Sequence, residues 1–367
     1  MTTRISTMIF LLIILSSCTL GTDVPSLPPS ISSEQKAQID SLVEAAIQDG
    51  PIASLGIGIQ FNGETSLTQV VGMADIAANG SAEPGLVYQI GSLTKTFTAV
   101  SIMMIVQEAD ITLDESITTY IPALPTDAAS ISIRHLLSHT SGLPNLEATN
   151  LEIDYSYAYQ PGEVIALLAE HFPELKFEPG TQFHYSNLGY FLLGAAIEEV
   201  TGLSYYSYLQ THILDPLNLE HTGACDSELG QIAQGHNVSG QDLIPAPSSN
   251  LSLAYSAGGL CSNVDDVLHW YTSLSSGDVI DQSLFDEMIE PVVLPNGTTL
   301  QSGFGFIVGD FLGEQAIGHI GRTSGFESFL VHFTDEGLTI VVLSNTNPMD
   351  PYALTTLISS IREVASN

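Results

Sequence analysis

The stretch Gln89-Ile90-Gly91-Ser92-Leu93-Thr94-Lys95-Thr96-Phe97-Thr98-Ala99-Val100 carries a hydroxyl and an amine at the start of a long apolar run. Residues three apart lie on the same face of a helix, so a helix that begins at Gly91 or Ser92 brings the Lys95 amine within reach of the Ser92 hydroxyl. The amine can then take the hydroxyl proton, which a serine nucleophile requires near neutral pH. The pair alone is a weak signal, because Ser and Lys three apart also occur on exposed helices as solvated pairs.

The residues that follow Lys95 favour a buried helix over an exposed one. From Phe97 to Val106 every residue is apolar or carries a hydroxyl. Burial lowers the pKa of a lysine and makes the amine a better base. We therefore predict that Ser92 is a nucleophile and that Lys95 activates it.

Length, composition and charge limit the classes of function. The 367 residues, 44% of them hydrophobic, suffice for one large domain or two closely packed ones. The formal charge of −34 arises because only seven Lys and Arg stand against 41 Asp and Glu. Such a surface repels nucleic acid and anionic membranes, so we predict no nucleic-acid partner. The scarcity of cations also makes those inside motifs more informative.

The first thirty residues have the composition of an export signal and a tether. A short basic region precedes the apolar run at 8–15, which is too short to span a bilayer comfortably, and small residues follow it. The string Leu15-Ser16-Ser17-Cys18 resembles a bacterial lipobox, which implies cleavage before Cys18 and acylation of that cysteine. We predict a signal peptide at 1–17 and a lipid-anchored tether at 18–30, so that only the lipid contacts the membrane of the cell envelope. The alternative is an ordinary signal peptide with an incidental cysteine.

Two cysteines remain after Cys18, and their number suits a disulfide. Cys225 and Cys261 form an even set in an exported domain, which makes them a candidate pair. The alternative is two separate buried thiols. No Cys-x-x-Cys, His-Glu-x-x-His or clustered His, Asp and Glu spacing indicates a metal site, so we predict neither metal nor cofactor.

Strand patterns lie near both chain ends, and helix patterns lie between them. Strands are expected at 54–61 and 67–72, joined by Asn62-Gly63, and at 304–308, 316–320, 327–333 and 338–344; helices are expected at 33–49, 93–108, 133–138, 161–170, 187–200, 205–213, 264–274 and 351–364. This order predicts an α+β fold, an α/β sandwich in which one antiparallel sheet from both chain ends is flanked by helices and carries an inserted helical subdomain. The domain covers 31–367, with sheet parts at about 31–90 and 300–367 and the helical part at about 91–299.

Two further segments carry groups that a hydrolase can use. In Tyr185-Ser186-Asn187 a phenol can relay protons, and an amide can orient a base or hold a substrate carbonyl. The segment from Gly318 to Phe326 ends a strand in glycines, where a substrate can approach the main-chain N–H groups. The alternatives are a core tyrosine beside a helix-capping asparagine and a glycine-rich turn.

Together the three segments resemble the penicillin-recognising serine hydrolases, which include serine beta-lactamases, especially of class C type, D-alanyl-D-alanine carboxypeptidases and related esterases. The resemblance covers about 33–365 and implies the beta-lactamase/transpeptidase-like fold. Three more strings look like family segments: 133–144, Asp215-Pro216-Leu217-Asn218-Leu219 and Ala257-Gly258-Gly259-Leu260-Cys261-Ser262. We interpret these three as mostly structural, because their residues suit turns and helix starts.

The resemblance implies a role for each matching residue. Ser92 is the nucleophile, Lys95 activates it, and Tyr185 carries the proton to the leaving group and later from water. Asn187 binds the acyl-side amide or carbonyl of the substrate, and His319 lines the site from the strand with Gly321. The backbone N–H groups of Ser92 and Arg322 form the oxyanion hole.

One departure from the family pattern bears on the substrate. His319-Ile320-Gly321 replaces lysine-threonine-glycine, which removes a permanent cation and a hydroxyl that help to hold a substrate carboxylate. Arg322 either replaces part of that charge or points its side chain away from the site.

The sequence therefore favours an exported serine hydrolase that acts on a small ester or a D-amino-acid peptide. A true beta-lactamase or D-alanyl-D-alanine carboxypeptidase is the alternative within the enzymes, and its substrate would be a beta-lactam or a peptide. A penicillin-binding sensor that is acylated at Ser92 without useful turnover is the alternative of another class. The sequence leaves the oligomeric state open.

Overall fold

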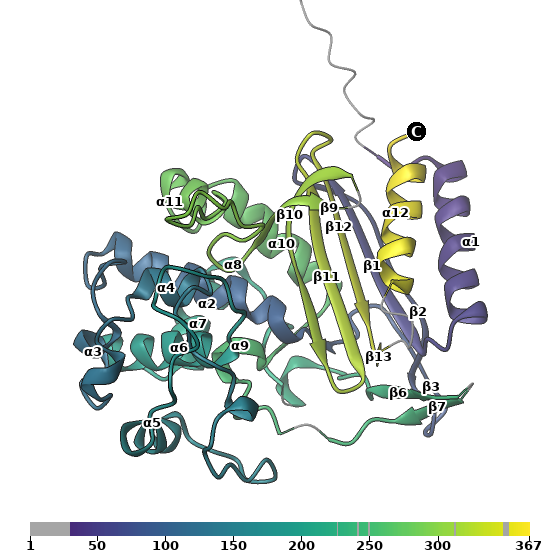
Figure 1. Cartoon of the computed structure of the whole chain (residues 1–367). Helices are drawn as coiled ribbons and strands as arrows, with labels where there is room; N and C mark the ends of the chain where they lie inside the picture. The colour runs from purple at the N-terminus through teal and green to yellow at the C-terminus, as the bar shows by residue number, and fades with distance from the viewer. Residues whose placement is uncertain (1–29, 226, 241, 249, 312, 348–351) are drawn as a thin grey trace, which may run out of the picture.

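The computed structural model describes residues 30–225, 227–240, 242–248, 250–311, 313–347 and 352–367. In this part of the chain, seven strands form one antiparallel sheet of order β3-β2-β1-β12-β11-β10-β9 (Figure 1). The strands are β1 (Ser54–Phe61), β2 (Glu64–Asp75), β3 (Gly80–Ser81), β9 (Ile307–Phe311), β10 (Glu314–Thr323), β11 (Phe326–Phe333) and β12 (Leu338–Ser344).

The centre of the sheet is made from the two ends of the chain, as predicted. β1 pairs with β12 along its length, from Leu55 opposite Ser344 to Phe61 opposite Leu338. Every residue of β1 and β12 is buried, because helices cover both faces of these strands. The predicted hairpin at Asn62-Gly63 is confirmed, with Phe61 facing Glu64 across the turn.

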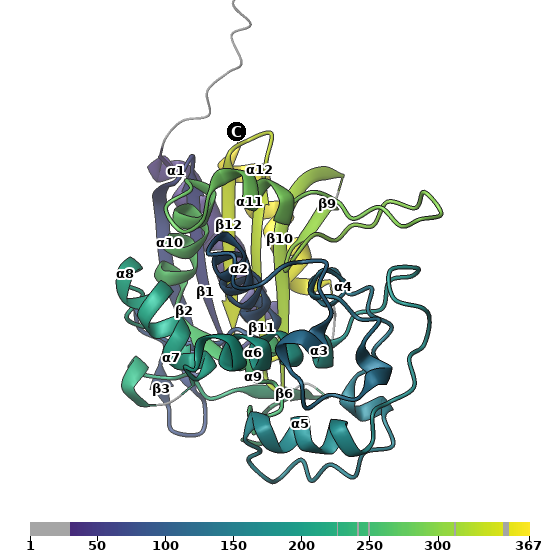
Figure 2. The same ribbon diagram turned by 90° about the vertical axis from the view of Figure 1, so that its left-hand side faces the viewer.

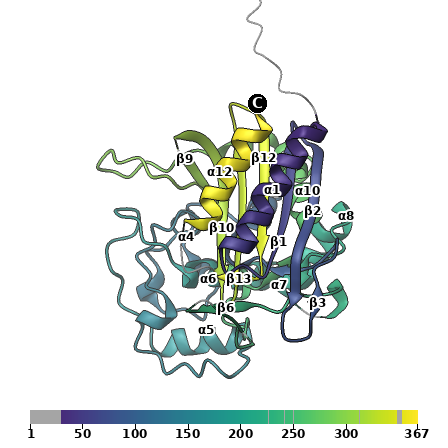
Figure 3. The same ribbon diagram turned by 90° about the vertical axis from the view of Figure 1, so that its right-hand side faces the viewer.

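Two helices from the chain ends cover the outer face of the sheet. α1 (Ser33–Asp49) and α12 (Ala353–Ala365) lie side by side on this face (Figure 3). Ser32 caps α1 by accepting a hydrogen bond from the Gln35 backbone N–H. Ile39 of α1 and Ile358 of α12 are fully buried between the helices and the sheet. This apolar layer holds the two ends of the chain together.

The opposite face of the sheet carries the helical part, which Figure 2 views from its own side. Its helices are α2 (Thr94–Gln107), α3 (Ile117–Tyr120), α4 (Ile133–Leu137), α5 (Pro161–Glu170), α6 (Asn187–Thr201), α7 (Tyr205–Leu209), α8 (Asp215–Leu217), α9 (Tyr255–Gly258), α10 (Val264–Ser275) and α11 (Gln282–Met288). α2 lies at the centre of this part and is buried on nearly every side. Because α2 begins next to the sheet, its first residues lie at the junction of the two parts.

The structure corrects the prediction in three places. The strand predicted at 304–308 is β9, shifted to Ile307–Phe311, because Phe304 and Phe306 are buried in the core of the helical part instead. β2 extends well beyond the predicted 67–72. Two small sheets were not predicted: β4 (Tyr88–Gln89), β8 (Leu260–Ser262) and β5 (Gly223–Ala224) form one, and β13 (Thr346–Asn347), β6 (His236–Ser239) and β7 (Asp242–Pro245) form the other.

The predicted signal peptide, the acylated Cys18 and nearly all of the predicted tether lie outside the described residues. Within the described ranges, none of the helices has both the length and the hydropathy that a bilayer crossing requires.

The structure joins Cys225 and Cys261 in a disulfide, which ties the end of β5 to β8. The bridge closes a loop with a sequence separation of 36 residues. Because cross-linking restricts the unfolded chain, we expect reduction with dithiothreitol to lower the free energy of unfolding by about 2–4 kcal/mol in urea titrations. The double variant Cys225→Ser/Cys261→Ser should match the reduced protein and should not respond to dithiothreitol. Identical unfolding curves with and without reductant would show that the bridge is absent or contributes nothing.

Candidate active site

Ser92 lies where the sheet meets the helical part. The chain makes one 3₁₀ turn, η1 (Gly91–Leu93), and continues directly into α2. The predicted spacing is therefore confirmed, since Lys95 Nζ lies 3.2 Å from Ser92 Oγ. A hydroxyl at the N-terminal end of a buried helix, with an amine one turn further on, is arranged for proton transfer between the two.

Lys95 is fully buried and makes three polar contacts. Its Nζ atom lies 2.8 Å from Asn187 Oδ1 and 2.7 Å from the carbonyl oxygen of Ala257, in addition to the contact with Ser92. Burial lowers the pKa of Lys95 well below its usual value. A neutral amine has two N–H donors and one lone pair. The two carbonyl oxygens can only accept hydrogen bonds, so in the neutral form of the amine the lone pair is left for the Ser92 hydroxyl.

Tyr185 lies beside the amine of Lys95. Lys95 Nζ is 4.8 Å from the centre of the Tyr185 ring. Burial raises the pKa of Tyr185 to about 12. Tyr185 is therefore a phenol at neutral pH, which can donate a proton.

Asn187 is positioned by the start of α6. Ser186 caps this helix, and its side chain accepts a hydrogen bond from the Gly189 backbone N–H. The cap makes Asn187 the first helical residue, and its side chain reaches Lys95. The predicted Ser92, Lys95, Tyr185 and Asn187 are thus brought into one cluster, although they come from two separate segments.

Two residues that support this cluster were not singled out from the sequence. The His139 ring lies 4.3 Å from the Tyr185 ring, and its Nδ1 atom accepts a hydrogen bond from the Ser186 backbone N–H. Asn145 accepts a hydrogen bond from the Asn187 backbone N–H at 2.5 Å, and its Nδ2 lies 3.4 Å from the Tyr185 carbonyl oxygen. His139 lies in the segment 133–144, which we interpreted as mostly structural, and Asn145 follows directly. These two residues hold the Tyr185–Asn187 loop in place.

The segment around α9 holds Lys95 from the other side. The Ala257 carbonyl oxygen accepts a hydrogen bond from Lys95, and the preceding carbonyl, that of Ser256, accepts one from Thr98 Oγ1 at 2.6 Å. Thr98 Oγ1 in turn lies 2.7 Å from the hydroxyl of Tyr205. The third family-like string, which begins at Ala257, therefore supplies a hydrogen-bond acceptor for the lysine through its backbone.

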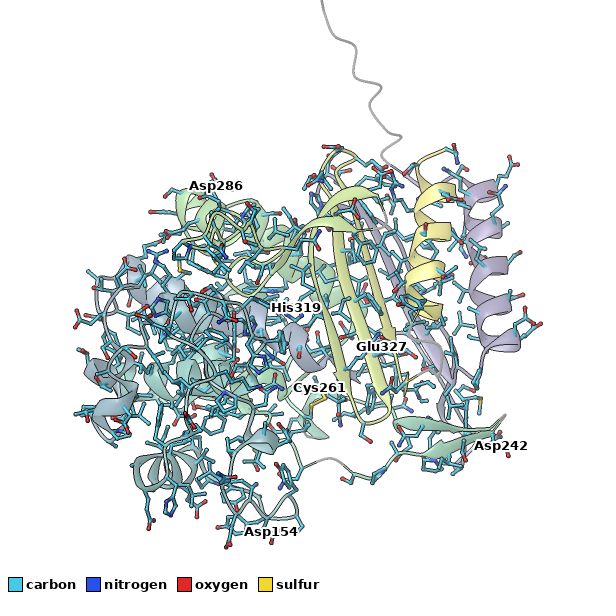
Figure 4. The ribbon with its side chains drawn as sticks, viewed as in Figure 1. Asp154, Asp242, Cys261, Asp286, His319 and Glu327 are labelled. Atoms are coloured by element: carbon cyan, nitrogen blue, oxygen red, sulfur yellow. A yellow bond between two sulfur atoms is a disulfide. The ribbon has the colours of Figure 1, made fainter. Side chains whose placement is uncertain are left out.

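The end of β10 brings three predicted residues to the cluster. His319 is 5% exposed and faces the helical part (Figure 4). Gly321 packs under η1, where a Cβ atom would lie 1.9 Å from the Ile90 carbonyl oxygen. Gly91 has a φ of +49°, and a Cβ atom there would lie 2.8 Å from the Arg322 nitrogen. Both glycines are therefore required for β10 to approach the turn that carries Ser92.

The side chain of Arg322 is engaged with a carboxylate on the neighbouring strand. Arg322 faces Glu327 across the β10–β11 pair, and its Nε lies 2.5 Å from Glu327 Oε1. The Glu327 side chain is 1% exposed, whereas that of Arg322 is 48% exposed. Side chains alternate along a strand, so Arg322 points to the face opposite His319 and Gly321. Its charge is paired there, and its backbone remains beside Gly91.

Two cavities flank this cluster. One of about 230 Å³ is lined by Ser92 and Asn187, together with Gly258, Glu147 and Arg322, whose side chain is paired with Glu327. The other, of about 250 Å³, lies on the side of Tyr185 and His319. The described residues contain no group of three or more His, Cys, Asp or Glu that could hold a metal ion.

Comparison with known proteins gives a consistent result. A family model described as Beta-lactamase matches residues 39–361. The chain is similar to Protein flp of Staphylococcus aureus, with 29% identity over 330 residues that cover 86% of this chain and 64% of that protein. It is also similar to penicillin-binding protein 4* of Bacillus subtilis, with 24% identity over 80% of this chain and 70% of that protein. The chain therefore spans less than two thirds of the length of Protein flp.

Solved structures share the fold. The octameric penicillin-binding protein homologue from Pyrococcus abyssi is 25% identical, with a TM-score of 0.74 over 88% of this chain and 77% of that chain. The D-amino acid amidase from Ochrobactrum anthropi SV3 is 23% identical, with a TM-score of 0.78 over 90% of this chain and 99% of that chain. The likeness to the amidase is one of fold alone.

Proposed function

Because the chain belongs to the Beta-lactamase family of serine hydrolases, we propose that it hydrolyses an ester or amide through an acyl-enzyme formed on Ser92. The observation that carries the proposal is the environment of Lys95. Its amine is buried and contacts two carbonyl oxygens and the Ser92 hydroxyl. A lysine held in this way is a base directed at one oxygen atom.

Acylation begins with the transfer of the Ser92 proton to the lone pair of Lys95 Nζ. Ser92 Oγ then forms a bond to the substrate carbonyl carbon, whose oxygen becomes an oxyanion. The backbone N–H groups of Ser92 and Arg322 are the proposed donors to this oxyanion, and the close approach of Gly91 to the Arg322 backbone supports this assignment. The loss of one such donor typically costs about 10²–10³ in rate.

Tyr185 completes both half-reactions as a proton carrier. When the bond to the leaving group breaks, the phenol donates its proton to the leaving atom and regains one from the protonated Lys95. In deacylation a water molecule passes a proton through Tyr185 to Lys95 and attacks the acyl carbon. The bond from this carbon to Ser92 Oγ then breaks, and Ser92 Oγ takes the proton back. The raised pKa of Tyr185 supports this role, because it keeps the phenol protonated at rest.

The charges around the site favour a small ester or a neutral amide as the substrate. Family members with lysine at the position of His319 hold a substrate carboxylate with a cation. Here the pKa of His319 is lowered to about 3 by burial, so the ring is neutral. The cation of Arg322 is paired with Glu327. A D-amino-acid peptide remains a candidate through its acyl side, where Asn187 contributes to the cavity beside Ser92.

The first experiment tests residues 31–367 with p-nitrophenyl butyrate, nitrocefin and a D-alanyl-D-alanine peptide, next to the Ser92→Ala variant. We expect Ser92-dependent cleavage of the ester and little or no turnover of nitrocefin. Rapid hydrolysis of nitrocefin or the peptide would favour the beta-lactamase or carboxypeptidase alternative. A stable adduct on Ser92 without turnover would favour the sensor.

We further propose that the protein is exported and anchored through a lipid on Cys18. The lipobox-like string before Cys18 supports this localisation. Cys18→Ala should release the protein from the membrane fraction when it is expressed with its leader. If the variant stays in the membrane fraction, the lipid anchor is wrong.

A further inference from the structure

The cavity beside Tyr185 and His319 lies on the leaving-group side of the site. Its volume is about 250 Å³, and side chains that carry no formal charge line it, among them Phe183, Phe306, Ile307 and the rings of His139 and His319. In the proposed mechanism Tyr185 donates its proton to the leaving atom, so the leaving group must lie on the Tyr185 side of Ser92. The opposite cavity, beside Asn187, then takes the acyl part.

His319 offers this cavity a hydrogen-bond acceptor. Its Nδ1 atom lies 2.8 Å from the carbonyl oxygen of Ile320, which can only accept, so Nδ1 carries a proton. A neutral imidazole has a single N–H group, which leaves a lone pair on Nε2. Burial keeps this ring neutral, since the pKa of His319 is about 3.

His139 has the opposite arrangement. Its Nδ1 atom accepts a hydrogen bond from the Ser186 backbone N–H at 3.2 Å, so the proton of the neutral ring lies on Nε2. Burial lowers the pKa of His139 well below its usual value, and the nearby Lys95 and His319 act in the same direction. Among the described residues, both rings make their protein hydrogen bonds through Nδ1. One Nε2–H donor and one Nε2 acceptor are therefore available to a ligand in the same cavity.

A carboxylate is poorly matched to these walls. It can only accept hydrogen bonds, so it would face the lone pair of His319 and lose its hydration without a cation in return. Arg322 points to the other face of β10 and is paired with Glu327. The charge of −34 on the whole chain also repels an anionic substrate at long range. Salt screens this repulsion.

The geometry points to a neutral leaving group that carries both a hydrogen-bond donor and an acceptor, such as a carboxamide, held between Nε2–H of His139 and Nε2 of His319. This inference rests on the proposed acyl transfer to Ser92 and names the leaving group that the site selects. It makes His139 and His319 residues that determine specificity.

Three aryl butyrates that differ in one substituent test the inference. The 4-butyryloxy derivatives of benzamide, acetophenone and benzoate share the acyl group, while the substituent is a donor and acceptor, a neutral acceptor of the same shape, or an anionic acceptor. Each kcat/KM is divided by the rate constant for hydroxide-catalysed hydrolysis, which corrects for leaving-group reactivity. We expect the benzamide to exceed the benzoate by at least about tenfold and the acetophenone to fall between them, because unpaired polar groups are costly in a buried site.

Two variants at one position separate charge from hydrogen bonding. His319→Lys should raise the benzoate relative to the benzamide by about tenfold or more, because it supplies donors and a cation. His319→Gln is the matched control, since an amide keeps both a donor and an acceptor and should preserve the preference for the benzamide. Only ratios within each variant are compared, so a general loss of activity does not affect the result. Measurements at about 0.1 M and 1 M NaCl remove the long-range repulsion.

Equal normalised values for the benzamide and the acetophenone, or a preference for the benzoate, would overturn the inference. So would a preference that disappears at high salt, because it would then come from the charge of the whole surface. An unchanged ratio in His319→Lys would show that His319 does not set the selectivity. If no butyrate is cleaved in a Ser92-dependent way, the proposed function itself fails, which is a different result.

Discussion

Replacing Ser92 by alanine is expected to abolish hydrolysis, with a loss in kcat of about 10⁴-fold or more, because no covalent intermediate can form. Lys95, Tyr185 and Asn187 would keep their positions, since the variant removes a single oxygen atom from the end of a turn. The residual rate would reflect only binding and the oxyanion donors. The measurement is steady-state hydrolysis of p-nitrophenyl butyrate, combined with mass spectrometry of the protein after a fluorophosphonate probe.

The matched control for this variant is Ser101→Ala on the same helix. Ser101 is also buried, but its hydroxyl donates a hydrogen bond to the Phe97 carbonyl oxygen and lies outside the site. Labelling should survive in Ser101→Ala and disappear in Ser92→Ala. A probe adduct on any other residue, or normal turnover without Ser92, would contradict the mechanism.

Replacing Lys95 by methionine is expected to lower kcat/KM by about 10²–10⁴-fold, the range that a positioned general base contributes. Methionine has a similar length and volume but cannot accept the Ser92 proton. The activity of the wild type should rise with pH as Lys95 loses its proton, around a pKa well below the usual value. His319 has a pKa of about 3 and Tyr185 has a pKa of about 12, so neither group titrates at the intermediate pH values where we expect Lys95 to lose its proton. The rising limb should therefore belong to Lys95 and be absent from the residual activity of the variant.

Lys36→Met is the control for the loss of a lysine outside the site. Lys36 is an exposed residue of α1 that pairs with Asp40 at 2.8 Å, far from the cluster. This variant should keep both the rate and the pH profile. Thermal unfolding of the two variants checks that each is folded. A Lys95→Met protein that keeps its rising limb would assign that limb, and the role of the base, to another group.

The sequence predicted most of the fold because its strands and helices differ in period and are separated by strong turn signals. The run at 54–61 became a strand with every residue buried, and Asn62-Gly63 turned it back as expected. The strand at 304–308 was misplaced because Phe304 and Phe306 are apolar for another reason, burial in the helical core. An apolar pattern indicates which residues are buried, but it does not indicate whether they lie in a strand or in another segment.

Local spacing predicted one pair of the candidate site, and the family resemblance supplied Tyr185, Asn187, His319 and Arg322. Ser92 and Lys95 are three residues apart, so helical geometry alone brings them together. Asn187 reaches the same amine from a position 92 residues further along the chain, which no local pattern contains. His139 and Asn145 act through a ring contact and backbone hydrogen bonds. Many residue types can make such contacts, so no sequence pattern identifies these two residues. The pairing of Arg322 with Glu327 was equally out of reach, since it depends on the register of β10 and β11.

The pairing of β1 with β12 also sets the order in which this fold can form. A growing chain contains Ser92 and Lys95 long before it contains β10, yet Leu55 finds its partner only when Ser344 has been made. Contacts between such distant segments form slowly, because a long loop must close first. The proposed nucleophile and its base are therefore synthesised early, before the strand that brings Arg322 beside them. A chain interrupted before β10 would lack the proposed oxyanion donor of Arg322, so we expect such a chain to be inert.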